Sequence, residues 1–464
     1  MRVKDAPDTG FDIETEVLLI GAGACGMAAA LAAKDSGAEV LVLEADPVPS
    51  GSTALSAGLI PAAGTRFQRG AGIEDDAVLF ASDIQHKARG ENPQELVAVL
   101  AQQSGATIEW LADQHGLPFS VVTDFDYPGH SRRRMHGLPT RSGQELVDRL
   151  RTACEAQGID IVCNQRATTL FVENDRMVGV EAQGPGGVVR IGCAALVLTS
   201  NGFGGNRQMV SDYMPEIENA LWFGHDGNKG DAVVWGTELG AECLHLGAYQ
   251  GHGNVAHPHG ILISWAVITE GGVQVNCHGE RFWDESQGYS EAARAVLSQP
   301  MGVAWAVFDE RIAKVARQFQ DFKDAEAAGA IRTAGTVCDL AEMCGLPIEA
   351  LEKAIVGLPV KGEDAFGRRF TGQTLKPPYC AVKVTGALFH TQGGLNITVD
   401  GRVRRREGGV FANLFAAGGA AVGVSGTGGS GYLSGNGLLS AVVMGRIAGR
   451  EAAIMIGGMQ NGSE

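Results

Sequence analysis

The stretch Val17-Leu18-Leu19-Ile20-Gly21-Ala22-Gly23-Ala24-Cys25-Gly26 decides the fold of this chain. Its first four residues are a short apolar run of the kind that is buried in a parallel sheet. The glycines follow at once, and residues 28–33 are strong helix formers. A second strand-like run, residues 39–43, ends on Glu44. The stretch therefore predicts a strand, a tight turn, a helix and a second strand.

The glycine-rich turn has the spacing of a dinucleotide-binding site. Gly21 makes the tight turn, Gly23 lets the backbone approach a pyrophosphate, and Gly26 lets helix and strand pack closely. The helix N-terminus supplies N–H donors and a dipole for the anion. Glu44 follows the second strand, where a carboxylate accepts hydrogen bonds from ribose hydroxyls and repels a 2′-phosphate. A bound dinucleotide is predicted; a glycine-rich turn without a ligand is the alternative.

The composition argues against several classes of protein. The 464 residues carry a formal net charge of −16, which disfavours a nucleic acid or an anionic membrane as partner. Nine cysteines include no CxxC pair, which argues against zinc and iron–sulfur sites and favours reduced thiols in a cytoplasm. No signal-like stretch follows Met1, and no segment approaches ~20 uninterrupted apolar residues. We therefore predict a cytoplasmic protein with no membrane span.

Strand and helix patterns divide the chain into three segments. Residues 1–236 and 377–464 are expected to form one dinucleotide-binding domain, interrupted by a second domain at residues 237–376. An antiparallel meander is predicted from residue 168, ending in a separate buried strand at 195–198. The other predicted elements are helices at 73–115, 143–157, 290–298, 309–317, 338–344, 347–356 and 438 to about 456.

Four further motifs resemble the fumarate reductase and succinate dehydrogenase flavoprotein superfamily. Ser50–Gly58 resembles its second flavin-contacting segment, residues 198–203 its turn beside the adenosine end, 227–231 its T-G-D-G segment, and 414–452 its closing flavin motif. The resemblance covers nearly the whole chain. It implies an α/β fold in which a Rossmann-type FAD-binding domain carries an inserted α+β substrate (capping) domain. It also implies FAD, a small-molecule substrate and an external electron acceptor.

The resemblance also implies the residues that hold FAD. Residues 437–439 would place N–H groups at the flavin N1/O2 edge and favour negative charge on the reduced ring. Some members bind FAD covalently through a histidine, but none occurs at residues 47–60 here, so non-covalent FAD is expected. The family often has glutamate at the position of Gly419, which weakens the assignment of one ribose contact. The implied cofactor-binding residues are Gly21, Gly23, Ala24, Gly26, Glu44, Ala45, Ser52, Thr53, Ser56, Ala57, Gly58, Ala167, Ser200, Asn201, Gly202, Asp231, Gly418, Gly435, Asn436, Gly437, Leu438 and Leu439.

Two tyrosines stand where fumarate reductases carry arginines. Residues 272–285 resemble the strip that precedes the family's proton-donating arginine, and that position falls on Tyr289. The arginine that binds the substrate carboxylate is replaced by Tyr432. The swap resembles the 3-ketosteroid Δ1-dehydrogenase branch, in which one tyrosine removes a proton and another polarises the ketone. The alternative is that both are ordinary half-buried aromatic residues.

Other candidate site residues come from the same resemblance. His390 opens residues 390–394, which match the family's H-T-x-G-G, whose histidine contacts the substrate carboxylate in fumarate reductases. His252 lies near another family histidine, with His257 and His259 as competitors. Tyr127 is a candidate for assisting the base, with a surface turn residue as the alternative. The basic run at residues 132–134 is predicted to be a solvated loop.

These motifs favour FAD-dependent α,β-dehydrogenation of a cyclic ketone. That reaction needs loss of an acidic α-proton and a β-hydride, with a phenol stabilising the enolate. The retained His390 points to a ketone that also bears a carboxylate, such as an oxocyclohexanecarboxylate. One alternative is a fumarate- or urocanate-type ene reductase. Another is a flavoprotein that serves electron transfer or scaffolding.

Overall fold

A computed structural model describes residues 2–461, with side chains through residue 458. The chain is mixed α/β and forms two compact units. The first unit holds the described residues up to Met209, Gly224–Tyr249, and those from His390 onward. The second holds Val210–Phe223 and Gln250–Phe389. The predicted second domain was residues 237–376. The second unit of the structure also includes residues 210–223 and 377–389, whereas residues 237–249 belong to the first unit.

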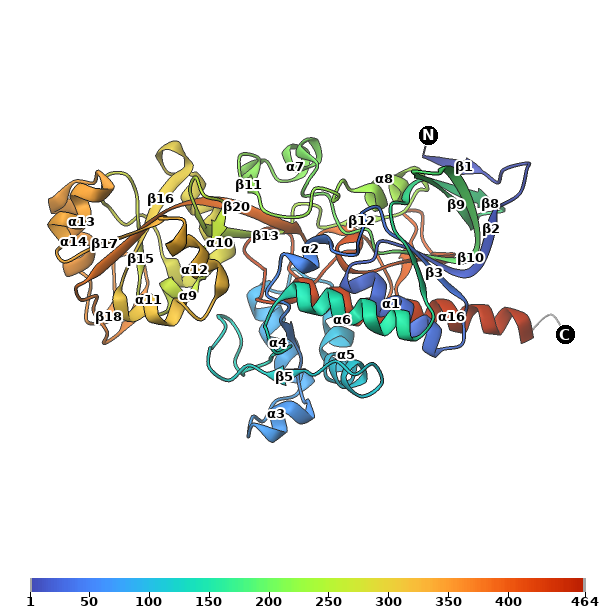
Figure 1. Cartoon of the computed structure of the whole chain (residues 1–464), viewed down its shortest axis with the longest axis horizontal. Coiled ribbons are helices and arrows are strands. Elements are labelled where there is room, and N and C mark those ends of the chain that lie inside the picture. The colour runs from blue at the N-terminus through green and yellow to red at the C-terminus, as the bar shows by residue number, and fades with distance from the viewer. Residues whose placement is uncertain (1, 462–464) are drawn as a thin grey trace. The chain divides into compact units, whose positions relative to one another are not determined.

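The first unit is built on a nine-stranded sheet (Figure 1). Its centre is parallel, because β7, β3, β2 and β10 are successive parallel neighbours and β23 is also parallel to β10. On the other side, β10, β9 and β8 form the predicted antiparallel meander. The strands are β1 (Val3–Asp5), β2 (Ile13–Ile20), β3 (Val40–Leu43), β7 (Asp160–Val162), β8 (Arg166–Glu173), β9 (Arg176–Gly184), β10 (Gly187–Leu198), β22 (Arg402–Arg404) and β23 (Val410–Ala416).

The predicted strand–helix–strand unit is confirmed. Helix α1 (Ala24–Asp35) joins β2 to β3, and it is buried from Ala24 to Ala33. Helix α16 (Gly445–Asn461) packs on α1. A Cβ at Gly445 would stand 2.5 Å from the carbonyl oxygen of Cys25, and one at Gly449 would overlap the carbonyl oxygen of Ala29. Small residues on both helices therefore allow this close approach.

Strand β10 corrects the prediction of a separate strand at residues 195–198. One continuous strand runs from Gly187 to Leu198. Its first half pairs antiparallel with β9, whereas its second half pairs parallel with β2 and, at its end, with β23. The strands that pair with β10 change along its length, while its own backbone stays extended. Two of them, β2 and β23, come from parts of the chain that are distant from β10 in sequence. Thr199, which follows the strand, donates through Oγ1 to the carbonyl of Ile20 at 2.8 Å.

Helices and short strands complete the first unit. The predicted helical regions at 73–115 and 143–157 contain α4, α5 and α6, and the helical run at the end of the chain starts at Asn436 and passes through a π-helical segment. The helices are α2 (Gly51–Ala54), α3 (Arg66–Gly70), α4 (Ala77–Lys87), α5 (Gln94–Asp113), α6 (Gly143–Ala156), α8 (Asp231–Glu238), η4 (Gly418–Ala420), α15 (Asn436–Leu439) and η5 (Ser440–Met444). The short strands are β4 (Ile60–Pro61), β5 (Ser120–Val121), β6 (Met135–Gly137), β12 (Cys243–Leu244) and β21 (Gly394–Leu395); α7 (Arg207–Tyr213) lies at the boundary of the units.

The second unit has its own seven-stranded sheet and apolar core. Strand β20 is central: it pairs antiparallel with β16 and β17 and parallel with β11. The strands are β11 (Leu221–Trp222), β13 (Tyr249–Ala256), β14 (Ile261–Leu262), β15 (Val273–Val275), β16 (Val303–Asp309), β17 (Ile331–Ala334) and β20 (Tyr379–Thr391), with β18 (Lys361–Glu363) and β19 (Arg369–Thr371) as a separate hairpin. This pairing of β20 explains why residues 377–389 belong to this unit.

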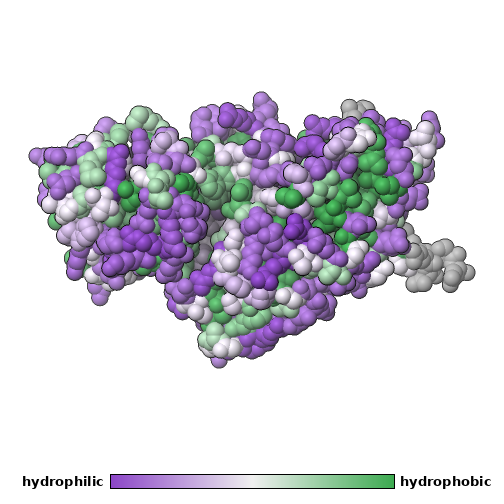
Figure 2. Space-filling view, in the orientation of Figure 1, coloured by the Kyte–Doolittle hydropathy of each residue, from purple (hydrophilic) through white to green (hydrophobic). Residues whose placement is uncertain are grey.

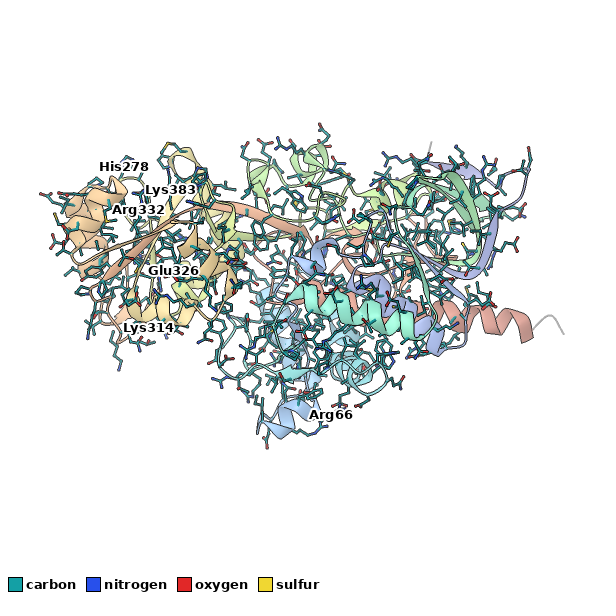
Figure 3. The ribbon with its side chains drawn as sticks, viewed as in Figure 1. Arg66, His278, Lys314, Glu326, Arg332 and Lys383 are labelled. Carbon is teal, nitrogen blue, oxygen red and sulfur yellow. The ribbon has the colours of Figure 1, made fainter. Side chains whose placement is uncertain are left out.

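The four helices predicted in the second unit are confirmed as α10 (Tyr289–Leu297), α11 (Glu310–Ala316), α13 (Val337–Cys344) and α14 (Ile348–Val356), and further helical segments are present besides them. These are η1 (Pro215–Ile217), α9 (Ala266–Thr269), η2 (Glu285–Gln287), η3 (Pro300–Gly302) and α12 (Gln320–Ala327). Helix α12 was not predicted, since it buries only Phe322 and Ala325 and has a weak apolar pattern. Lys314 on α11 is exposed (Figure 3).

The surface is consistent with the strong net charge. Hydrophilic side chains cover most of the face shown in Figure 2. Among residues 2–461, no helix combines the length and apolar character needed to span a bilayer. Within the same residues no cluster of His, Cys, Asp or Glu is suited to hold a metal ion. All nine cysteines lie in the described part and are free thiols.

Candidate active site

The glycine-rich turn after β2 leaves room for a ligand at one position. Gly21 has φ +105°, and a Cβ there would stand 2.7 Å from the Thr199 carbonyl oxygen. A Cβ at Gly26 would overlap the Gly21 carbonyl oxygen, so the protein itself requires both glycines. At Gly23 an added Cβ would meet only Thr53 Oγ1, at an ordinary 3.6 Å. The protein gives no reason for glycine at 23, whereas a ligand lying against the backbone does.

Glu44 lies where the sequence predicts a ribose contact. It is 9% exposed and follows β3 directly. Its carboxylate accepts the N–H of Ala22 at 2.7 Å and the N–H of Asp46 at 3.0 Å. Two carboxylate oxygens have about four acceptor positions, so these bonds orient the group and leave acceptor capacity for hydroxyls.

The Ser50–Gly58 segment is tied to the start of α1. Thr53 Oγ1 accepts the N–H of Ala24 at 3.2 Å, and Ser56 Oγ donates to the Thr53 carbonyl at 2.7 Å. Ser52 Oγ accepts a hydrogen bond from Asn228 Nδ2 at 2.8 Å. Three of the predicted cofactor-binding segments thus meet: the glycine turn, Ser50–Gly58 and residues 227–231.

The end of β10 explains one departure from the family pattern. Asn201 has φ +63°, and its Oδ1 accepts the N–H of Gly202 at 2.8 Å. A Cβ at Gly419 would overlap this Oδ1. The Asn201 side chain therefore fills the space that a glutamate at position 419 would need. Next to it, Ser200 Oγ is buried with no hydrogen-bond partner among the described residues.

The remaining predicted cofactor residues occupy varied environments. Asp231 forms ion pairs with Arg166 at 2.6 Å and Arg2 at 3.2 Å, so its carboxylate is engaged within the protein. Gly418 (φ +61°) lies against Cys25, and Gly435 (φ +85°) caps the helical run that begins at Asn436. Ala45 follows Glu44, Ala57 lies before Gly58, Ala167 is buried in β8, and Leu438 and Leu439 lie in α15.

His390 and Tyr432 form a pair in the first unit. Their rings meet edge to face, with centroids 5.4 Å apart and planes at 72°. A Cβ at Gly437 would stand 2.8 Å from His390 Nε2 and 3.5 Å from the Tyr432 hydroxyl oxygen. The Gly437 N–H also donates to that hydroxyl oxygen, at 3.3 Å. Glycine at 437 therefore lets the imidazole and the phenol meet at the start of the final helix.

Burial keeps both members of this pair uncharged. It raises the pKa of Tyr432 to about 12, although N–H groups of Gly437 and Gly435 oppose the rise. Burial lowers the pKa of His390 to about 4, opposed by the Thr391 carbonyl. At neutral pH the phenol is protonated and the imidazole is neutral. A protonated phenol can donate its hydrogen to an oxygen acceptor.

A buried polar chain leads away from His390, and sequence reasoning missed it. Gln392 Nε2 lies 3.0 Å from His390 Nδ1. Gln392 Oε1 accepts from Ser425 Oγ at 2.6 Å, and Ser425 Oγ accepts from Asn436 Nδ2 at 3.2 Å. Gln392, Ser425 and Asn436 are 5%, 1% and 0% exposed, so each bond is shielded from water. The sequence signals were the position of Gln392 inside the H-T-x-G-G motif and the prediction of Asn436 as a cofactor contact.

His252 and Tyr289 form a second pair, in the second unit. Their rings are stacked, with centroids 5.0 Å apart and planes at 19°. Phe389 also stacks with His252, at 5.3 Å, and Trp265 meets it edge to face at 5.8 Å. Burial lowers the pKa of His252 to about 3. The imidazole is therefore neutral, and its Nδ1 accepts the N–H of Asn254 at 3.1 Å.

The Tyr127 loop is fastened to the chain next to Tyr432. His130 donates through Nε2 to the carbonyl of Ser434 at 2.9 Å. Tyr127 is half-buried, meets Phe125 edge to face at 4.9 Å, and lines a cavity of about 600 Å³ with His130. Burial raises the pKa of Tyr127 to about 12. Its phenol is therefore protonated at neutral pH.

The basic run beside this loop is only partly solvated, which corrects the prediction. Arg132 and Arg133 are exposed. The Arg134 side chain is 0% exposed and forms ion pairs with Asp75, at 2.8 Å, and with Asp83. A buried guanidinium needs such partners, because an unpaired charge in the interior is costly. Arg134 therefore anchors the loop that carries Tyr127.

Comparison with known proteins identifies the family. A family model described as an FAD binding domain matches residues 16–438. The chain belongs to this family of FAD-binding proteins. The probable fumarate reductase Ifc3 of Shewanella frigidimarina (strain NCIMB 400) is 34% identical over 463 residues, which cover 97% of this chain and 77% of that protein.

Solved structures agree with the family. A flavocytochrome c3 fumarate reductase in an open conformation superposes with a TM-score of 0.82 and 33% identity, covering 97% of this chain and 79% of that one. The 3-ketosteroid-Δ4-(5α)-dehydrogenase of Rhodococcus jostii RHA1 shares the fold, with a TM-score of 0.78 and 24% identity over 98% of this chain and 100% of that one. The predicted flavoprotein superfamily is confirmed, and this family member is an FAD-dependent oxidoreductase.

The first unit fits the family's cofactor. The open space at Gly23 suits a pyrophosphate at the start of α1, and the oriented Glu44 carboxylate suits a ribose. The buried Ser200 Oγ, which has no partner among the described residues, suits a ligand hydrogen bond. Glycine, acidic and hydroxyl groups of the types that FAD requires are thus present.

Proposed function

We propose that this flavoenzyme catalyses α,β-dehydrogenation of a cyclic ketone. The observation that carries the proposal is the environment of Tyr432. Its phenol is buried and stays protonated, since burial raises its pKa to about 12, and its oxygen already accepts the N–H of Gly437. A protonated phenol carries a hydrogen that it can donate to a substrate oxygen. A donor of this kind stabilises the enolate that forms when a ketone loses its α-proton.

The chain's residues take distinct roles in this proposal. When bound, FAD supplies the two-electron acceptor for the β-hydride. Tyr432 polarises the ketone, and Tyr289 removes the α-proton. Tyr289 is the first residue of α10, and the N-terminus of a helix favours negative charge, which suits a phenolate base. His252 orients Tyr289 by stacking on its ring, and Tyr127 assists the base.

We further propose a Rossmann-type FAD-binding domain for the first unit and a substrate (capping) domain of the α+β class for the second. FAD is bound non-covalently, because residues 47–60 contain no histidine. Acid denaturation should therefore release the flavin into the supernatant; flavin fluorescence that stays with the precipitated protein would contradict this. An external acceptor reoxidises the flavin, and the proposed compartment is the cytoplasm.

His390 narrows the substrate class. The proposed ketone also bears a carboxylate, as an oxocyclohexanecarboxylate does, because His390 stands in the motif whose histidine contacts a carboxylate in fumarate reductases. The steroid dehydrogenase of similar fold supports a ketone substrate, and its whole length is covered by this chain.

A second candidate is an ene reductase that runs the chemistry in the opposite direction. The 34% identity to a probable fumarate reductase favours it. This reading retains His390 as a carboxylate contact, and Tyr289 replaces arginine as the proton donor. It differs from the leading proposal in whether oxidised or reduced enzyme reacts.

Anaerobic mixing distinguishes the two functions. Oxidised holoenzyme is mixed with a panel of cyclic ketones, with and without a carboxylate, and the flavin absorption is followed. Bleaching by a ketone is the expected result. Dithionite-reduced enzyme is mixed with fumarate-like alkenes in parallel, and reoxidation there, without bleaching by ketones, would overturn dehydrogenation in favour of reduction. Reaction with neither set would point to a role in electron transfer.

A further inference from the structure

The hydrogen bonds of the polar chain at His390 run in one direction, from Asn436 through Ser425 and Gln392 to His390. Ser425 uses its single hydroxyl hydrogen on Gln392 Oε1, at 2.6 Å, and receives a hydrogen bond from Asn436 Nδ2, at 3.2 Å. With its oxygen held by Ser425, the Gln392 carboxamide turns its NH2 group toward His390. A hydroxyl has one donor and a carboxamide has two, so the direction of each bond follows from its neighbour.

The NH2 group of Gln392 faces two acceptors. It lies 3.0 Å from His390 Nδ1 and 3.5 Å from the carbonyl oxygen of Thr391. The Thr391 carbonyl is itself 3.3 Å from Nδ1, so it competes as a partner that would need a hydrogen on Nδ1. A hydrogen on Nδ1 would point at the Gln392 NH2 group, whereas a bare Nδ1 accepts from it at the shorter distance. The carboxamide therefore favours His390 without a hydrogen on Nδ1.

We propose that Gln392, oriented by Ser425 and Asn436, is a positioning residue that holds His390 in the neutral form with its hydrogen on Nε2. The catalytic consequence rests on the proposed function: His390 donates a hydrogen bond to a substrate oxygen and is not the base. The Nε2 edge is the one that faces Gly437, and the Tyr432 phenol lies against the same glycine. Two neutral donors at one glycine suit a carbonyl or carboxylate oxygen and disfavour a cation.

The burial of the pair agrees with this assignment. An imidazolium would need acceptors at both ring nitrogens. At Nδ1 the nearest group, the Gln392 NH2 at 3.0 Å, is not one, and the Thr391 carbonyl lies farther away, at 3.3 Å. Burial and the facing donor therefore act in the same direction, against protonation of His390. The chain of Asn436, Ser425 and Gln392 determines which nitrogen carries the hydrogen, and it does so without touching the substrate.

The first experiment reads the tautomer directly in FAD-loaded enzyme without substrate. Histidine is labelled with ¹⁵N, two-bond proton–nitrogen correlation spectra are recorded at neutral pH, and the His390 signals are assigned by their loss in His390→Asn. We expect Nε2 to be protonated and Nδ1 to be bare. A hydrogen on Nδ1, as would follow if both carboxamides were turned by 180°, overturns the inference. This result does not depend on which reaction the enzyme catalyses.

The second experiment reverses the tautomer. Gln392→Glu places a carboxylate at Nδ1, which accepts a hydrogen there and leaves Nε2 bare at alkaline pH. KM for a carboxylate-bearing ketone should rise about tenfold or more, the loss of one hydrogen bond to a charged group, while kcat changes less. Gln392→Met, which removes the donor but keeps the length, should shift KM in the same direction. The ¹⁵N spectrum of Gln392→Glu must show the hydrogen on Nδ1.

Matched measurements separate this inference from the proposed function. Flavin content and melting temperature of both variants are compared with wild type, so that loss of fold is recognised. Unchanged KM in a folded Gln392→Glu enzyme whose His390 hydrogen has moved to Nδ1 would overturn the donor role. If wild-type enzyme reacts with no ketone at all, the proposed function is wrong. The tautomer of His390 is still decided by the ¹⁵N spectrum of the first experiment.

Discussion

Two His–Tyr pairs are built from the same residue types but have different surroundings. In the second-unit pair, His252 and Tyr289 have nearly parallel, stacked rings, and Phe389 also stacks with the imidazole. The first-unit pair, His390 and Tyr432, meets edge to face, and its imidazole is hydrogen-bonded by a side chain, Gln392. The side chains around His252 are aromatic rings, whereas a side-chain hydrogen bond also positions His390.

The difference determines how each imidazole is controlled. Nδ1 of His252 accepts a backbone N–H from its own strand, at 3.1 Å, and substitution of a side chain does not remove that donor. Nδ1 of His390 accepts from Gln392, which a single substitution removes. Both histidines are neutral, yet only His390 depends on a replaceable partner. We therefore expect substitution of His390 to affect substrate binding, and substitution of His252 to affect stability and the orientation of the stacked rings.

The largest effects are expected at the two tyrosines. Tyr289→Phe should lower kcat by ~10²–10⁴-fold, as loss of a general base does. Tyr432→Phe should lower kcat by ~10²–10³-fold, as loss of one donor to an oxyanion does. KM should change much less in both, because each hydroxyl acts as charge develops. Steady-state kinetics with the ketone found by anaerobic mixing measures both.

The double variant sharpens the comparison. If both hydroxyls act in one transition state, the two losses are non-additive. Near-wild-type turnover of Tyr289→Phe would remove it as the base. Since Phe keeps each ring, flavin spectra and melting temperatures serve as controls for the stack on His252 and for the edge-to-face contact with His390.

The next largest effects are expected at the two histidines, and they should differ in kind. His390→Ala should raise KM roughly 10–100-fold with a smaller change in kcat, since one hydrogen bond to a charged group is lost. His252→Ala should instead destabilise the fold by roughly 2–4 kcal/mol, because it empties a buried site between two rings. Urea denaturation and kinetics are measured on both variants. Equal effects on KM at the two positions would contradict the assignment of His390 to substrate binding and of His252 to stability.

Glu44 provides a test that leaves both pairs untouched. Glu44→Ala should weaken FAD binding by about 1–3 kcal/mol, the range for a charged acceptor. Glu44→Gln is the matched comparison: it keeps the side-chain length and one acceptor oxygen, which can serve only one of the Ala22 and Asp46 amides, because these bind different carboxylate oxygens. Affinity is measured by flavin fluorescence on refilling the apoprotein. An unchanged affinity in Glu44→Ala would show that this carboxylate is not at the ribose.

A pH dependence of stability is expected at His252, comparable in size to the effect at Glu44. Its folded pKa of about 3 lies below the ordinary 6.5, so the unfolded state binds the proton more tightly. The stability of the neutral form is fully present above pH 6.5 and is lost as pH falls toward 3. Between pH 7 and pH 5 wild type should lose ~2 kcal/mol more than His252→Phe, which keeps the stack. Equal losses, measured by urea denaturation at both pH values, would contradict a neutral buried His252.

Local patterns explain what the sequence could predict. The strand, glycine turn and helix at residues 13–35 need only neighbours along the chain, and Glu44 follows from the same spacing. The H-T-x-G-G motif likewise located His390. The continuity of β10 was not predictable in this way, because its second half is stabilised by β2 and β23, far away in sequence.

The polar chains were missed for the same reason. Arg134 is buried because Asp75 and Asp83, more than fifty positions earlier, lie beside it. The role of Gln392 depends on Ser425 and Asn436, which belong to a later loop and helix. A single sequence gives the residue types but not these long-range hydrogen-bond partners. The structural roles of Arg134 and Gln392 are therefore visible only in the folded chain.

The packing of α1 against α16 bears on the order in which the chain matures during synthesis. Helix α1 leaves the ribosome long before α16, yet part of its alanine-rich surface is covered by Gly445 and Gly449 of α16. Domains fold as their parts are synthesised, so this face of α1 stays uncovered until α16 has been made. A nascent chain that stalls before residue 445 therefore exposes an apolar helix face to chaperones and proteases.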